Sequence, residues 1–155
     1  MKTLSQILAE RKRAVCSIGP NDSVRRALEV MAQENVGALL VMEQDNLAGI
    51  FSERDYTRKG ILHGKTSLET KVHEIMTSLV TCISQDKTVD EAMAVMNDKH
   101  IRHLPVLGEN SRVVGIVSIR DLIKETISDQ AFLIKQLVCY VQGDCLEGES
   151  AQPRH

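Results

Sequence analysis

Apolar and polar residues follow the same order twice along this chain. Each half begins with a short apolar run, at residues 15–18 and 80–83, that ends in polar turn residues and predicts a strand. Residues 24–34 and 89–99 come next and carry apolar side chains at helical spacing, so we predict a helix in each half. A serine or a threonine directly precedes each helix and is suited to cap its free N–H groups.

The second part of each half has the pattern of a hairpin followed by another helix. Two apolar runs separated by a tight polar turn predict the hairpin, and a further apolar run at helical spacing predicts the helix. The hairpin strands are expected at residues 37–42 and 47–51 and at 102–107 and 113–117, and the helices at 55–62 and 121–127. Each half is therefore predicted to be a β-α-β-β-α unit.

The junction between the last strand and the last helix carries one string, Gly-Ile-x-Ser-x-Arg-Asp, in both halves. It occupies residues 49–55 and 115–121, so the two serines are 118 − 52 = 66 positions apart. The runs before it match at an offset of 65, as in 88 − 23 = 65 for the two capping residues. The chain is therefore an internal duplication. Because one unit is too small to bury its own apolar faces, we expect an α/β (α+β) fold in which the two units pack as a pseudo-two-fold pair.

The segments outside the two repeats are predicted to be a lead-in, a linker, a C-terminal helix and a tail. Gly64 and the small polar residues after it favour a linker. Spaced apolar side chains after residue 129 predict a C-terminal helix that stops at Gly143. The expected divisions are a helical lead-in at 1–14, the first repeat at 15–64, the second repeat with its lead-in at 65–128, a C-terminal helix at 129–143 and a disordered tail at 144–155.

Composition narrows the class of protein. The chain has 155 residues, of which 43% are hydrophobic and 26% charged, which is typical of a soluble globular protein. A net charge of −2 gives no general attraction to nucleic acid or an anionic membrane, and the longest apolar runs are strand-sized. The N-terminus lacks the pattern of a secretory signal. We therefore expect a cytoplasmic protein with no nucleic-acid and no membrane partner.

Catalytic and metal-binding patterns are not found in the sequence. The four cysteines are scattered without a CxxC motif and are expected to be free thiols, with a Cys139–Cys145 disulfide left open. Neither a P-loop, nor a nucleophile elbow, nor a cluster of His, Cys and carboxylate residues is present. We therefore expect no enzymatic activity, no metal site and no catalytic cofactor.

The duplicated pattern resembles a tandem pair of CBS domains, the modules named after cystathionine β-synthase. The resemblance covers about residues 15–127 and is closest to stand-alone CBS-pair proteins of bacteria and plant organelles. It is carried by the two Gly-Ile-x-Ser-x-Arg-Asp strings, by IRHLPV at 101–106, by NVGALLV at 35–41 and by EIMT at 74–77. It implies that adenine nucleotides bind in two clefts between the paired repeats.

The polar residues of the two strings are the candidates for contacts with a nucleotide. Each aspartate is suited to accept hydrogen bonds from the 2′- and 3′-hydroxyls of a ribose, and each serine to donate to a phosphate. Each arginine presents a planar, charged fork for phosphate oxygens, beside a helix N-terminus that adds partial positive charge. The candidates are Ser52, Arg54 and Asp55 in the first site and Ser118, Arg120 and Asp121 in the second.

The base is expected in an apolar slot beside these groups. The candidates are Ile18, Ala38 and Leu40 in the first site and Thr81, Ile83, Arg102, His103, Pro105 and Val106 in the second. Gly37 and Ala38 stand where the second repeat has Arg102 and His103, so the first site has either lost polar contacts or opened for a larger ligand. We expect the second site to be the stronger one. A capping role alone for each Ser-x-x-Asp, and a packing role alone for His103, stay open.

The resemblance thus implies a regulatory module that senses adenosine nucleotides, with AMP as the first candidate and NAD or ATP as alternatives. The ligand would change how the repeats or two protomers pack, and so modulate a client protein or the assembly of a homodimer. The carboxylates should disfavour dinucleotides that carry a 2′-phosphate. The alternative is an interaction scaffold whose nucleotide clefts are vestigial.

Overall fold

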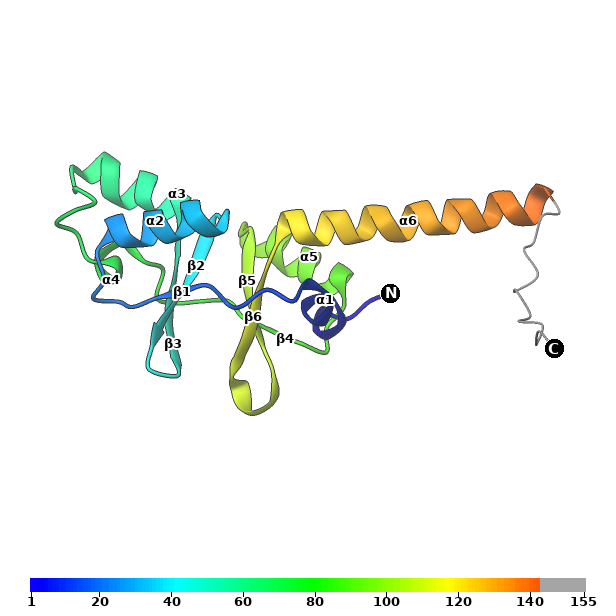
Figure 1. The fold of residues 1–155 in the computed structure, drawn as a ribbon, viewed down its shortest axis with the longest axis horizontal. Helices are drawn as coiled ribbons and strands as arrows, with labels where there is room; N and C mark the ends of the chain where they lie inside the picture. The colour runs from blue at the N-terminus through cyan, green and yellow to red at the C-terminus, as the bar shows by residue number, and fades with distance from the viewer. Residues whose placement is uncertain (143–155) are drawn as a thin grey trace, which may run out of the picture.

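The two repeats form two three-stranded sheets of the same topology (Figure 1). The structure is a computed structural model that describes residues 1–142. In each sheet the first two strands run parallel and the last two antiparallel. The strands are β1 (Ser17–Ile18), β2 (Ala38–Glu43) and β3 (Asn46–Ser52) in the first sheet, and β4 (Ile83–Ser84), β5 (His103–Leu107) and β6 (Val113–Ser118) in the second. The predicted α/β fold of two paired repeats is confirmed.

Helices α2 (Val24–Glu34) and α5 (Val89–Lys99) connect the first two strands of each sheet, over the residues that the sequence predicts. Both begin at the predicted hydroxyl residue. The side chain of Ser23 accepts a hydrogen bond from a backbone N–H of α2 at 3.1 Å, and that of Thr88 does the same for α5 at 3.3 Å. Each cap therefore satisfies an N–H that the helix itself leaves unpaired.

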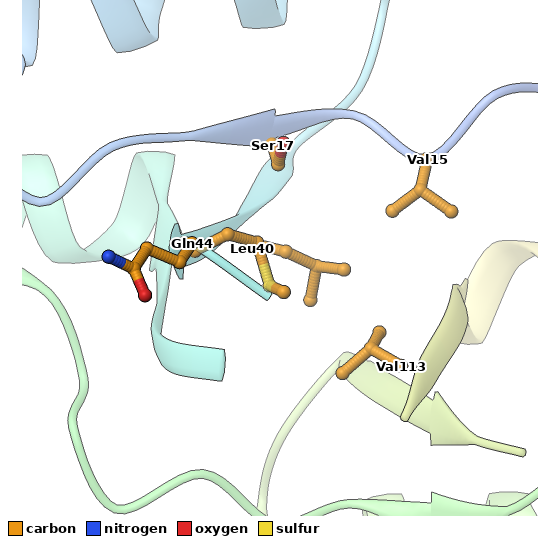
Figure 2. A pocket seen from close by; sticks show the side chains of 6 residues that line it. Val15, Ser17, Leu40, Gln44 and Val113 are labelled. Atoms are coloured by element: carbon orange, nitrogen blue, oxygen red, sulfur yellow. The ribbon is translucent and has the colours of Figure 1, made fainter. Parts of the chain in front are cut away.

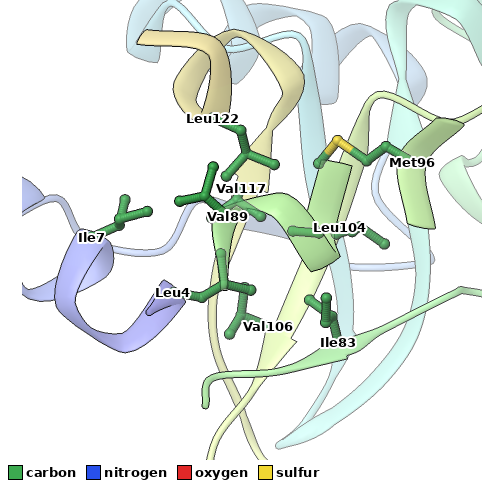
Figure 3. Packing of buried hydrophobic residues seen from close by; sticks show 10 residues of the cluster. Leu4, Ile7, Ile83, Val89, Met96, Leu104, Val106, Val117 and Leu122 are labelled. Carbon is green, nitrogen blue, oxygen red and sulfur yellow. The ribbon is translucent and has the colours of Figure 1, made fainter. Parts of the chain in front are cut away.

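The two lead-in helices pack on each other's repeats. Leu4 and Ile7 of α1 (Leu4–Arg11) lie in the core of the second repeat, against residues such as Leu122 (Figure 3). Both end residues of α4 (Val72–Ile75) lie in the core of the first repeat. The sequence places each of these helices directly before a repeat, but in space each completes the hydrophobic core of the other one.

Backbone hydrogen bonds hold this exchange in a symmetric way. The first N–H of α1 donates to the Lys87 carbonyl at 2.9 Å, and the first N–H of α4 donates to the Asp22 carbonyl at 2.9 Å. Each acceptor directly precedes the capping residue of a repeat helix. Neither repeat therefore has a complete core without a segment that belongs, in sequence, to the other.

The closing helices of the two repeats differ from the prediction and from each other. The first, expected at 55–62, is broken into α3 (Glu53–Asp55), a π-helical turn at Tyr56–Gly60 and a 3-10 turn at Ile61–His63. Glycine is a poor helix former, and Gly64 ends the segment in a left-handed conformation at φ 70°.

The second closing helix is longer than expected. The predicted break between residues 128 and 129 is wrong, because α6 (Ile119–Gln142) runs through it without a glycine or a proline to interrupt it. In Figure 1 it extends well beyond the two sheets. The predicted stop at Gly143, the tail and Cys145 lie outside the described residues.

Other expectations concern thiols, metals and membranes. Cys16, Cys82 and Cys139 are free thiols, whereas the open Cys139–Cys145 pairing falls partly outside the described residues. Within residues 1–142, no three His, Cys, Asp or Glu side chains gather closely enough to hold a metal ion. The helices of that same range include none with the length and apolar character needed to span a membrane.

Candidate functional site

The first Ser-x-x-Asp forms a closed box at the start of α3. The backbone N–H and the hydroxyl of Ser52 both donate to Asp55 Oδ2 at 3.0 Å, and the Asp55 N–H donates back to the Ser52 hydroxyl at 3.2 Å. The second carboxylate oxygen, Oδ1, lies 3.2 Å from Lys59 Nζ and accepts a hydrogen bond from the Thr77 hydroxyl at 3.2 Å. Both oxygens of Asp55 therefore already have partners in the protein.

The second Ser-x-x-Asp forms the same box at the start of α6, with a different neighbour. The N–H and hydroxyl of Ser118 donate to Asp121 Oδ2 at 2.8 and 2.6 Å. The same oxygen lies 2.9 Å from Nη1 of Arg11, the last residue of α1. Among the described residues, none forms a hydrogen bond or an ion pair with Asp121 Oδ1. This carboxylate keeps one oxygen available.

Electrostatics favour a charged carboxylate at the second site. Burial by itself would raise the pKa of Asp121, but the two hydrogen bonds from Ser118 and the nearby Arg11 guanidinium outweigh it. The net effect lowers the pKa of Asp121 below its ordinary value. Asp121 is therefore ionised at neutral pH and acts as a hydrogen-bond acceptor.

The strand starts beside the two boxes also differ. Ala38 pairs with Ser52 across β2 and β3, and His103 pairs with Ser118 across β5 and β6. His103 is half-buried, and burial lowers its pKa, although the nearby Asp121 charge acts in the opposite direction. His103 is therefore neutral at pH 7 and can both donate and accept a hydrogen bond.

Gly37 brings the two strand starts together. A β-carbon at Gly37 would lie 3.7 Å from both Cε1 and Nε2 of His103, which is ordinary contact distance. The main chain of one repeat thus faces the imidazole of the other. Gly37, the equivalent of Arg102, and His103, the equivalent of Ala38, therefore lie next to each other between the repeats.

The remaining predicted residues fall into two groups. The apolar ones are buried in the sheets, and Ile18, Ile83 and Val106 belong to the hydrophobic cores. Leu40 and Pro105 are also buried, and Thr81 is half-buried. The arginines at 54, 102 and 120 are exposed, and within residues 1–142 none of them forms an ion pair. The structure thus groups each Ser-x-x-Asp with a strand start and leaves the arginines at the surface.

Two hollows are lined in part by the segment that leads into β1. One, of about 230 Å³, is lined by apolar side chains of the first repeat and by Val113 of the second, with Ser17 and Gln44 as its polar members (Figure 2). The other, of about 320 Å³, shares Val15 and Ser17 with it. Of the predicted site residues, only Leu40 lines either hollow. The volume of the first is below the range of about 300–1,000 Å³ that is usual for ligand pockets, and the volume of the second is at its lower end.

Sequence reasoning missed the residues that contact the two carboxylates from outside the strings. Lys59 was detectable, because it is four residues after Asp55 and such pairs meet on one helical face. Thr77 lies within the EIMT segment, but its contact depends on the exchange of lead-ins. Arg11 is 121 − 11 = 110 positions from Asp121, and only the packing of α1 on the second repeat brings them together.

Comparison with known proteins identifies the class. The model of the CBS domain matches this chain twice, over residues 9–60 and 72–128. Each match contains the strands of one of the two sheets. The chain therefore belongs to the CBS-domain family, and the resemblance inferred from its repeated strings is confirmed.

Several relatives are similar over most of this chain. The mitochondrial CBS domain-containing protein CBSX3 of Arabidopsis thaliana is 41% identical over 129 residues, which are 79% of this chain but only 62% of that relative. The structure of a CBS-domain protein from Burkholderia ambifaria has 42% identity and a TM-score of 0.78, over 83% of this chain and 96% of that one. A CBS domain protein from Pyrobaculum aerophilum, solved in complex with AMP, has 27% identity and a TM-score of 0.67, over 77% and 89% of the two chains.

Proposed function

We propose that this chain is a regulatory module that binds an adenosine nucleotide, with AMP as the first candidate and ATP or NAD as alternatives. The observation that carries the proposal is the pair of carboxylates, Asp55 and Asp121, each held by its serine where a strand passes into a helix. The relative from P. aerophilum that was solved with AMP supports the choice of ligand. We propose no catalytic residues for this chain.

The second site is the stronger one in this proposal. Asp121 has Oδ1 available for a ribose hydroxyl, and Arg11 lies beside it as a cation for the phosphate. The exposed Arg120 can turn toward the same phosphate. At the first site a ribose must first displace Lys59 or Thr77 from Asp55, which costs part of the binding free energy. In both sites the carboxylate repels a 2′-phosphate.

Ligand binding at the second site would act on two helices at once. Asp121 lies in the first turn of α6, and Arg11 is the last residue of α1. A phosphate that draws Arg11 away from Asp121 would loosen the contact between these helices. The ligand then shifts the protein only by the difference in its affinity for the two arrangements. The regulated event is proposed to be homodimer assembly or the binding of a client protein.

An interaction scaffold with vestigial clefts is the second candidate. It is favoured by the small volume of the two hollows, about 230 and 320 Å³, and by the partners that already occupy Asp55. In that case specificity would lie on the surface and on α6 rather than between the repeats.

Isothermal titration with AMP, ATP, NAD and NADP separates these functions. We expect AMP to bind with a measurable heat and NADP to bind at least about tenfold more weakly than NAD, since like charges repel at the carboxylate. Folded protein that binds none of these ligands at millimolar concentration would leave the scaffold as the better account. Mass spectrometry of small molecules released from freshly purified, denatured protein gives an independent check.

A further inference from the structure

The distal half of α6 presents an apolar surface that the rest of the described chain does not cover. Its large apolar side chains from Phe132 onward are exposed, with Leu137 at 63% and Val141 at 83% of their full accessibility. In Figure 1 this part of the helix stands clear of both sheets. A surface helix normally turns its apolar side toward a core. An exposed apolar stretch of this length marks an interaction site.

One stripe on this helix has the spacing of a coiled-coil seam. Its members follow one another at alternating steps of four and three residues. They are Ile123, Ile127, Gln130, Ile134, Leu137 and Val141. All six are exposed, from 43% at Ile123 to 83% at Val141. The neighbouring stripe differs, because Leu122 is buried and Thr126 contacts Met93 of α5.

We propose that this seam pairs with the same seam of a second copy of this chain. An alternation of three and four residues keeps one side of a helix against a partner helix over several turns. The seam continues from Ile123, beside the sheets, to Val141, near the end of the described residues. Over these residues a helix is about 27 Å long, which is sufficient for more than two heptads of contact.

Charge favours an identical partner over an acidic or a basic one. Residues 130–142 contain a single charged side chain, Lys135. Because it directly follows Ile134, it lies off the seam, and two copies can approach without placing like charges opposite each other. An acidic helix would find only Lys135 as a complementary charge along this stretch, and a basic helix would find none.

Gln130 adds a feature that suits self-pairing. It is the one polar member of the seam, and its amide carries both donors and an acceptor. Two Gln130 side chains at the same level can therefore satisfy each other. A single polar residue in an apolar seam fixes the register of the pair.

Residues 143–155 are poor in apolar side chains. Residues 143–155 are mostly polar or small, and Leu146 is their only large aliphatic side chain. One such side chain cannot bury the whole apolar face. A second copy supplies the matching set of aliphatic groups.

Mass measurement in solution tests the proposal, which does not depend on nucleotide binding. We expect light scattering on the ligand-free protein to give a mass above that of one chain. The double variant Ile134→Glu/Leu137→Glu should have at most half of the wild-type mass at the same concentration, while Lys135→Glu should keep it. These positions are outside both hydrophobic cores, so the thermal unfolding midpoint of the repeats checks that the variants fold. A wild-type monomer at tens of micromolar, or an unchanged mass of the double variant, would overturn the proposal.

Disulfide trapping tests the register. In a chain with Cys139 and Cys145 replaced by serine, Gln130→Cys should form covalent dimers under mild oxidation, because the seam brings the two residues face to face. Lys135→Cys is the matched control and should form few. Equal trapping at both positions, or none at position 130, would contradict pairing along this seam.

Discussion

The two Ser-x-x-Asp boxes have almost the same internal geometry but different surroundings. Asp55 is held on both oxygens, by Ser52 on one and by Lys59 and Thr77 on the other. All the described partners of Asp121 meet on one oxygen. The repeated string therefore builds the box, and segments outside the string decide what the carboxylate can still bind.

The lead-in helices cause part of the difference, and Lys59, which follows the string in the first repeat, causes the rest. The helix α4 has four residues and ends before Thr77, which then pairs with Ile50 of β3 through two backbone hydrogen bonds of 3.0 and 2.9 Å. The helix α1 has eight residues, so its last turn carries Arg11 to Asp121. Counted from the start of each lead-in, 77 − 72 = 9 − 4 = 5, so Ala9 is the counterpart of Thr77 in the sequence, although it lies within α1. The Thr77 hydroxyl thus has no counterpart among the described partners of Asp121, which include the Arg11 guanidinium instead.

The largest difference in stability between the two repeats is expected when the glycine that begins each string is replaced. A β-carbon at Gly49 would lie 2.7 Å from the Thr77 carbonyl oxygen, whereas one at Gly115 would meet only the end of the Leu8 side chain, at 2.8 Å. The backbone cannot move aside as a leucine can. Gly49→Ala should lower the free energy of unfolding by about 2–3 kcal/mol and Gly115→Ala by about 1 kcal/mol or less. Urea unfolding of both variants measures the difference. An equal decrease in the free energy of unfolding would show that both lead-ins can move aside equally well for the added methyl group.

The Thr77 hydroxyl should have the next largest effect. Thr77→Val removes its hydrogen bond to Asp55 and makes the first site resemble the second. The expected loss is about 1 kcal/mol in the free energy of unfolding, because a partly buried hydrogen bond is lost without a change of volume. Ala9→Ser is the reciprocal variant and should be near neutral. Thermal unfolding of both variants in one buffer checks this, and a neutral Thr77→Val would mean that the contact does not stabilise the fold.

Only part of the fold and of the candidate site could be predicted from the sequence. The duplication, the capping residues Ser23 and Thr88 and the strand and helix order followed from local spacing, because those features depend on neighbouring residues. The exchange of lead-ins did not, since nothing in the spacing of Leu4 or Val72 tells which repeat it packs on. The continuous α6 was missed because polar residues at 128 and 129 resemble a loop, although neither breaks a helix.

A smaller effect concerns the pH dependence of stability. Burial lowers the pKa of His103 below the ordinary value of 6.5, while the equivalent Ala38 has no group to titrate. Below about pH 6.5 the unfolded chain takes up this proton first, so the stability present above that pH is lost as the pH falls toward the folded pKa. His103→Gln should flatten the fall in the unfolding midpoint between about pH 6.5 and pH 5. An unchanged slope would show that His103 titrates alike in both states.

The smallest expected effect is that of the Arg11 ion pair on stability. Arg11 and Asp121 are only partly exposed, at 25% and 33%, but the pair is close enough to solvent for salt to weaken it. Arg11→Gln should lower the free energy of unfolding by less than about 1 kcal/mol. It should weaken AMP binding more clearly than it weakens the fold, and Lys59→Gln is the matched variant of the first site. If Arg11→Gln strengthened AMP binding, the guanidinium would be a competitor of the ligand rather than its partner.

The most direct test of the central claim, that nearly identical strings form unequal sites, is a calorimetric titration of AMP into Asp121→Asn and Asp55→Asn. Asparagine keeps an acceptor for the serine cap but removes the charge, so the fold is kept while a charge-assisted hydrogen bond to ribose is lost. We predict that Asp121→Asn weakens the tighter binding event at least about tenfold, since such a bond contributes about 1.5–3 kcal/mol. Asp55→Asn should change the same event less than about threefold. Equal losses in the two variants, or a larger loss in Asp55→Asn, would contradict the claim.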